Sequence, residues 1–220
     1  MLSNSSLNMK AQIEINEQYP CKAPGCDKNR HSLSSYCGAH HAKRLYFGSI
    51  DARKIRYNET ELERVKARHV VEANPDHPAI QQCIEFFTTW LENAVNDIPG
   101  IPCKKQFVRM HQEGVTGKEL AIEAISILLF HQKYPGTIPD DTPEPFQIAL
   151  ALAVVCFRKR EHLGIRHIAH TKISARERKI LGKNIWNELG KALTIVASEI
   201  RSYERAKERQ IQYGKLIVSY

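Results

Sequence analysis

The sequence predicts an all-α fold in which a small zinc-finger module precedes a helical domain. Three of its six cysteines and a histidine lie close together near the N-terminus, at a spacing typical of metal ligands. Apolar residues recur at helical spacing through most of the rest of the chain, and no strand-like alternation of any length occurs. We therefore expect a disordered tail at residues 1–18, a zinc-finger module at 19–51 and a helical domain at 58–220.

The N-terminal tail carries little that could hold a fold. Residues 1–18 are rich in Ser and Asn, with isolated leucines at Leu2 and Leu7, and this composition favours disorder. The tail also lacks the apolar segment of a secretory signal, so we expect a cytoplasmic or nucleoid-associated protein. In a reducing compartment, clustered cysteines bind a metal more often than they form disulfides.

The cysteine cluster has the spacing of a four-ligand metal site. Cys21 and Cys26 flank a Pro-Gly pair that permits a tight turn, and Cys37 precedes His40 by about one helical turn. Three thiolates and one imidazole form a tetrahedral zinc set. We predict one structural zinc, with His41 as the alternative to His40. The module has no apolar run of its own, so we expect its folding to depend on the metal.

The same residues resemble small treble-clef-like zinc fingers of phage and mobile-element proteins that handle DNA, often beside an HNH nuclease domain. The shared pattern is Cys-x4-Cys, a basic linker, an aromatic residue before Cys-x2-His, then Lys-Arg, an aromatic residue and a closing glycine, Gly48. The resemblance implies a knuckle at Cys21 and Cys26, and a short helix that begins near Cys37 and His40. It covers about residues 19–51, where Gly-Ser-Ile-Asp replaces the usual Gly-Asp after the helix.

Six helices are expected after the module, each from its apolar period and its end signals. Their ranges are about 58–73, 78–97, 103–113, 116–134, 142–157 and 174–212. The residues that signal starts are Asn58, Pro102, Thr116, Pro143 and Ser174, and Pro75 and Pro78 end the first helix. Thr116 and Ser174 each precede a glutamate by three residues, which is the pattern of a capping box.

The core of the helical domain is predicted from its most apolar segments. Residues 110–130 have the look of a helix-turn-helix, but 125–130 are too apolar to lie in a major groove, so we expect them to be buried. No apolar run is long enough to span a membrane, so we expect no membrane partner. The predicted core includes Trp90, Leu128, Val154 and Trp186, with Cys83 and Cys156 as small buried residues.

The net charge of +8 is distributed unevenly along the chain. Residues 21–56 carry eight Lys and Arg against two Asp, residues 158–220 carry fifteen against six Glu, and residues 57–157 are acidic. Two basic segments favour an anionic partner, which we expect to be nucleic acid, with DNA preferred to RNA. The residues expected to contact its phosphates are Lys43, Arg44, Arg53, Arg166, Lys172, Arg176 and Lys179.

The sequence offers no catalytic constellation. Its ten histidines include no HExxH pair, and no glycine-rich phosphate loop occurs. His162, His167 and His170 cluster, but among nine Lys and Arg and only two Glu in 158–183, which indicates an anion-binding surface. A zinc with four protein ligands has no open position for a substrate. We therefore expect no enzyme activity, including that of an HNH nuclease, and no small-molecule substrate.

Two hypotheses of function follow from these features. The first is a zinc-dependent nucleic-acid-binding protein, a DNA-binding regulator or accessory factor of phage or mobile-element type. The second is a non-enzymatic adaptor that binds a partner protein through its zinc finger and helical domain, with its basic segments merely solvated. A surface on which the two basic segments adjoin would favour the first hypothesis, and basic segments on opposite faces would favour the second.

Overall fold

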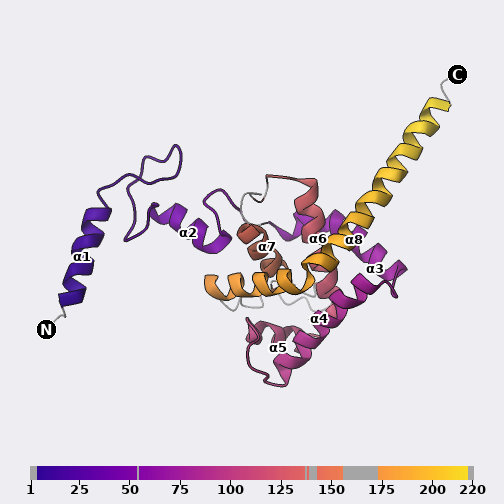
Figure 1. Ribbon diagram of the computed structural model, residues 1–220, viewed down its shortest axis with the longest axis horizontal. Helices are drawn as coiled ribbons and strands as arrows, with labels where there is room; N and C mark the ends of the chain where they lie inside the picture. The colour runs from indigo at the N-terminus through magenta and orange to yellow at the C-terminus, as the bar shows by residue number, and fades with distance from the viewer. Residues whose placement is uncertain (1–3, 54, 137, 139–142, 156–172, 218–220) are drawn as a thin grey trace.

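The fold is all-α, as the sequence predicts (Figure 1). A computed structural model describes residues 4–53, 55–136, 138, 143–155 and 173–217. Within these residues the only pairing of strand type is an isolated bridge between Pro20 and Asn29. The N-terminal helix and the cysteine module lie to one side of the cluster formed by helices α3 to α8.

In place of the disordered tail expected at residues 1–18, the structure has a helix, α1 (Asn4–Asn16). From residue 8 onward nearly all of its side chains are exposed, so local backbone hydrogen bonds and one end contact hold it. At that end the Asn16 amide donates to the carbonyl oxygens of Ser32 and Ser34, at 2.7 and 2.8 Å. The Arg30 guanidinium donates in turn to the Asn16 side-chain oxygen at 3.2 Å. These long-range bonds join the helix to the cysteine module. The composition of residues 1–18, on which the expectation of disorder rested, does not report bonds of this kind.

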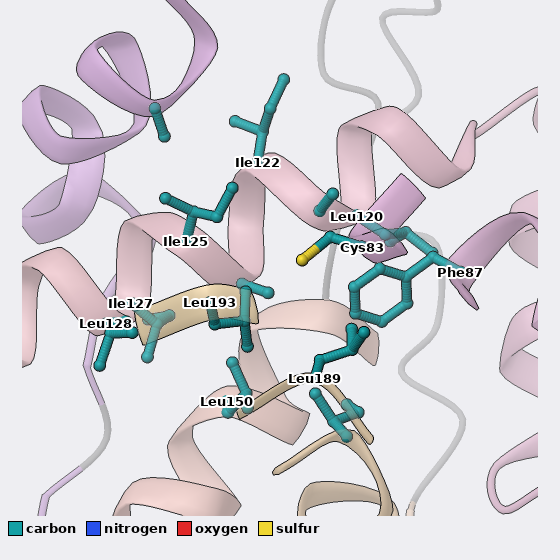
Figure 2. Packing of buried hydrophobic residues seen from close by; sticks show 14 of the residues in the cluster. Cys83, Phe87, Leu120, Ile122, Ile125, Ile127, Leu128, Leu150, Leu189 and Leu193 are labelled. Atoms are coloured by element: carbon teal, nitrogen blue, oxygen red, sulfur yellow. The ribbon is translucent and has the colours of Figure 1, made fainter. Parts of the chain in front are cut away.

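The helical domain is built around α6 (Gly117–Lys133), from which almost every side chain between residues 117 and 130 is buried. This helix packs against α3 (Glu61–Ala73), α4 (Pro78–Val95), α7 (Pro143–Val155) and α8 (Ala175–Ile217). Figure 2 shows side chains from α4, α6, α7 and α8 gathered in one cluster. The expectation that 125–130 is core and not a recognition helix is thereby confirmed.

The remaining helix of the domain, α5 (Lys104–Gln112), packs on α4 through an aromatic contact. The Trp90 and Phe107 rings lie edge to face with their centroids 5.5 Å apart. Trp90 and Trp186 are partly buried against the core, and Leu128 and Cys83 lie inside it, as expected. Cys156 and the side chain of Val154 lie outside what the structure describes.

Two glycines allow helices to cross at close range. A Cβ at Gly182 of α8 would lie 2.0 Å from the carbonyl oxygen of Gln147 on α7. A Cβ at Gly117 would lie 2.2 Å from Thr88 Oγ1 and 2.5 Å from the carbonyl oxygen of Ile84, both on α4. No side chain larger than hydrogen fits at such a distance, so these positions fix how closely α8 and α6 approach their neighbours.

Helix starts follow the predicted signals except at Pro102 and Asn58. The helix expected to open at Cys103 after Pro102 begins instead at Lys104, and Cys103 is its N-cap in the left-handed conformation, with a φ of +57°. Thr116 and Glu119 form a reciprocal capping box, and Ser174 and Glu177 make the same pair of bonds. Asn58, expected as an N-cap, instead lies within a 3-10 turn, Tyr57–Thr60, and α3 begins after it. The Glu59 carboxylate accepts from the backbone N–H of Arg56, the N-cap residue of that turn, at 2.6 Å.

A buried ion pair joins α3 to α6. The Arg64 guanidinium donates to the Glu123 carboxylate at 2.5 Å, and the two side chains are 6% and 3% exposed. Burial raises the pKa of Glu123, and the adjoining Arg64 opposes that rise. An unpaired buried charge costs free energy, so each of the two side chains reduces the cost of burying the other.

The last helix, α8, extends beyond the rest of the helical domain. Its buried side chains end near Ile200, and from there it extends away from the other helices (Figure 1). The helix continues to Ile217, five residues past the end expected from the apolar stripe. None of the described helices combines the length and the apolar character that a membrane span needs.

Candidate metal centre

The first pair of ligands lies on a tight knuckle. The Cys21 N–H donates to the carbonyl oxygen of Lys28 at 2.8 Å, which closes a short hairpin next to the Pro20–Asn29 bridge. Within the turn the Cys26 N–H donates to the Ala23 carbonyl oxygen at 3.2 Å. Gly25 has a φ of +70°, a conformation that glycine adopts without strain. The Pro-Gly pair therefore makes the turn that brings Cys21 and Cys26 to the same point.

The second pair of ligands lies at the start of a helix. Cys37 is the N-cap of α2 (Gly38–Phe47), and His40 follows within its first turn. The helix ends at Gly48, which is in the left-handed conformation with a φ of 81°. Cys37 is 3% exposed and Cys21 is 7% exposed, so the thiols form the small core of an otherwise open module.

The four side chains converge with the dimensions of a tetrahedral site. Their ligand atoms all lie within 4.8 Å of one another. His40 Nδ1 is 3.5 Å from Cys21 Sγ and 3.4 Å from Cys37 Sγ, and Cys26 Sγ is 3.9 Å from Cys37 Sγ. Bonds of about 2.3 Å to sulfur and 2.1 Å to nitrogen in a tetrahedron give separations of about 3.8 Å and 3.6 Å. The residues therefore fit one metal ion.

The geometry selects His40 over His41 as the fourth ligand. His41 contributes its backbone N–H to the Cys37 carbonyl oxygen at 2.8 Å, which is an ordinary helical bond. Its ring lies beside that of His31, with centroids 6.4 Å apart. Of the two histidines, His40 alone is in the converging group.

The backbone around the cluster favours a thiolate at Cys21. Burial opposes ionisation of this thiol, but the N–H groups of Cys37 and Ala23 point at its sulfur, at 3.2 and 3.4 Å. With His40 and Cys26 beside it, the pKa of Cys21 falls to about 6. At Cys26 the backbone near Lys28 lowers the pKa, but burial and the two neighbouring thiols outweigh it, so the pKa rises. A dication among these thiols reverses the repulsion between them.

Comparisons of the chain with protein-family models, with characterised proteins and with solved structures found no match. The metal centre therefore rests on the donor set and its geometry alone.

The basic residues predicted to bind phosphate fall into three groups. Lys43 and Arg44 lie on α2 and Arg176 on the first turn of α8, and all three are exposed. Two others are already paired: Arg53 makes a two-pronged pair with Glu59 at 2.7 and 2.9 Å, and Lys179 lies 2.7 Å from Glu144. Arg166 and Lys172 lie outside the described residues.

The structure also shows a contact that the sequence did not reveal. The guanidinium of Arg178, on α8, lies over the Tyr46 ring of α2, with its central carbon 4.7 Å from the ring centroid. Arg178 was counted among the basic residues of its segment but had no assigned role. The position of Arg178 in the sequence could have indicated this contact. It lies one turn before Leu181 on the apolar stripe of α8, and an arginine at a buried position usually has a partner.

Proposed function

We propose that this chain is a zinc-stabilised nucleic-acid-binding protein, a DNA-binding regulator or accessory factor of phage or mobile-element type. The contact between Tyr46 and Arg178 is the observation that supports this proposal. Through it the helix that follows the metal ligands meets the start of α8, so the two basic segments of the sequence adjoin each other. Adjoining basic segments present one anionic partner with more charge than either segment alone.

Exposed cations flank this junction on both helices. Lys43 lies one turn before Tyr46 on the same face of α2. Among the described residues, no carboxylate forms an ion pair with Lys43 or with Arg176. Such side chains suit the phosphate backbone, which positions a protein on its nucleic acid without reading the sequence. We propose that DNA is preferred to RNA and assign no residue to a base edge.

Zinc has a structural role in this proposal. Cys21, Cys26, Cys37 and His40 supply four protein ligands, which is the closed set of a structural site. The metal would fix the first turn of α2 against the knuckle and thereby set the direction in which Lys43 and Arg44 project. We propose a binding protein and not an enzyme.

The proposal is tested by binding assays across a salt series. The intact, zinc-loaded chain is titrated with a labelled 20-base-pair DNA duplex, with single-stranded DNA and with RNA. We expect the logarithm of the binding constant to fall linearly with the logarithm of salt concentration. Each lost duplex phosphate contact flattens that slope by about 0.9, so K43Q/R44Q flattens it by about 1.8 if both residues contact phosphate.

A matched control lies on the same chain, far from the junction. R205Q/K207Q removes two exposed charges from the distal part of α8 and is expected to leave affinity and slope unchanged. R176Q is expected to behave like the α2 variants. The proposal fails if no nucleic acid binds at low salt, or if the control weakens binding as much as K43Q/R44Q.

One observation favours the adaptor as a second candidate function. Leu62 and Val65, which share a face of α3, are 55% and 61% exposed. Exposed apolar side chains of this size on one face suit a protein partner. If the chain binds none of the nucleic acids, the adaptor function becomes the favoured one. The variant L62E/V65E would then test it, because it should weaken binding to a protein partner.

A further inference from the structure

Arg178 has donors that the described protein does not satisfy. The residue is 9% exposed, and its Nε and Nη2 atoms are buried without a hydrogen-bond partner. Buried guanidinium groups almost always bind an acceptor, because an unpaired buried donor costs free energy. An orphan of this kind therefore indicates a ligand that completes the site.

The two unpartnered atoms define the shape of that ligand. Nε and Nη2 lie on one edge of the guanidinium, from which they can donate two parallel hydrogen bonds in its plane. This fork matches two oxygens of a phosphate or a carboxylate. The Tyr46 ring lies under the central carbon of the group at 4.7 Å, so a cation–π contact holds the guanidinium at the junction of the two helices.

Two carboxylates, one in the first turn of α8 and one on the adjoining α7, are engaged elsewhere. The Glu177 carboxylate accepts from the Ser174 N–H and hydroxyl, at 3.0 and 2.7 Å, and that of Glu144 pairs with Lys179. The acceptor for Arg178 must therefore come from outside these pairs.

We propose that the Nε–Nη2 edge of Arg178, at the junction of α2 and α8, binds a phosphodiester oxyanion. The inference rests on the proposed function and names the phosphate contact that links the two basic segments. Arg178 lies in the first turn of a helix of 43 residues, where the positive end of the helix dipole favours an anion. Lys43, one turn from Tyr46 on the same face of α2, adds a second positive charge on the α2 side of the junction.

The ligand reaches this edge when the contact between α2 and α8 opens. Tyr46 is 49% exposed, so its ring already has one side in solvent and can turn aside with little loss of buried area. The contact would then re-form around the bound phosphate. Binding at this junction would hold the finger against the helical domain.

The test compares R178K with the wild-type chain, both zinc-loaded. Lysine keeps the charge and most of the stem but lacks the fork, so we expect duplex affinity to fall at least tenfold. R178Q removes the charge as well and is expected to flatten the salt slope by about 0.9. R205Q, an exposed arginine farther along α8, is the control and is expected to change neither. Circular dichroism and thermal melting establish that each variant is folded.

A second measurement separates this inference from the proposed function. Inorganic phosphate at ten times its dissociation constant is expected to raise the melting temperature of the wild-type chain by about 4 °C, and that of R178K by much less. If DNA binds wild type and R178K equally, the Arg178 site is refuted and the proposed function stands. If no nucleic acid binds but phosphate still stabilises wild type selectively, the oxyanion site stands and the proposed function fails. If neither binds, both are refuted.

Discussion

The close crossing of α7 and α8 makes a sharp prediction for Gly182→Ala. A methyl group there would lie 2.0 Å from the Gln147 carbonyl oxygen and 2.5 Å from its carbon, whereas ordinary contact begins near 3.4 Å. The obstruction is backbone, so no rotamer change can relieve it, and the two helices must separate by about 1.4 Å. Overpacking costs about 3 kcal/mol at the upper end of its usual range, and alanine regains about 1 kcal/mol of helix propensity. We expect a net loss of about 2 kcal/mol.

The same helix provides the matched control, Gly190→Ala. The three atoms nearest to its methyl group would belong to the Trp186 side chain, at 3.1 to 3.4 Å, and a side chain can shift. The free energy of unfolding should then change by less than about 1 kcal/mol, in either direction. Urea unfolding followed by circular dichroism measures both, and a difference of about 2 kcal/mol corresponds to about 1 M in the midpoint. Equal midpoints for the two variants would refute the close packing of α7 on α8.

Three further predictions concern the metal centre, the buried ion pair and a helix cap. Cys37→Ser should reduce the metal content well below the one zinc per chain expected of the wild type, as measured by elemental analysis; an unchanged content would exclude Cys37 as a ligand. Arg64→Ala should lower the free energy of unfolding by about 3–5 kcal/mol, because it leaves Glu123 buried without its partner, whereas the exposed Arg68→Ala should change it by under about 0.5 kcal/mol. Ser174→Ala should cost about 1 kcal/mol at pH 7. Bonds from Ser174 lower the pKa of Glu177 from 4.5, so their stabilisation is present above that pH and is lost as the pH falls through the lowered value. The difference in the free energy of unfolding between Ser174→Ala and the wild type should therefore become smaller in acid. A difference that does not change with pH would contradict the bonding between Ser174 and Glu177.

The sequence predicted most reliably what local chemistry determines. The spacing of metal ligands is set by the local turn and helix start that carry them. For Cys21 and Cys37 this spacing was enough to predict that they bind the metal. The capping boxes at Thr116 and Ser174 could also be predicted from the sequence, because each involves only four consecutive residues. The close approach at Gly182 involves a residue on α7 that lies 35 positions earlier in the sequence, so no local pattern identifies that partner.

Long-range contacts account for what the sequence did not predict. Helix α1 is fixed at its end by carbonyl groups of Ser32 and Ser34, and no composition rule reports such a bond. Asn58 was a reasonable cap, but Glu59 bonds backward to Arg56 and draws the chain into a 3-10 turn. The role of Arg178 depends on Tyr46, which lies 132 positions earlier and on a different module.

The central position of α6 has a consequence for how the chain folds during synthesis. Its partners α3 and α4 precede it, but α7 and α8 follow it, and Leu189 and Leu193 close the core from its far side. A nascent chain that ends at residue 134 would expose much of the helix whose side chains form the centre of the core. At about 5–20 residues per second, the ribosome takes several seconds more to reach Ile200. The metal ligands, by contrast, are complete by His40, so the module can take its metal long before the helical domain has the residues to close its core.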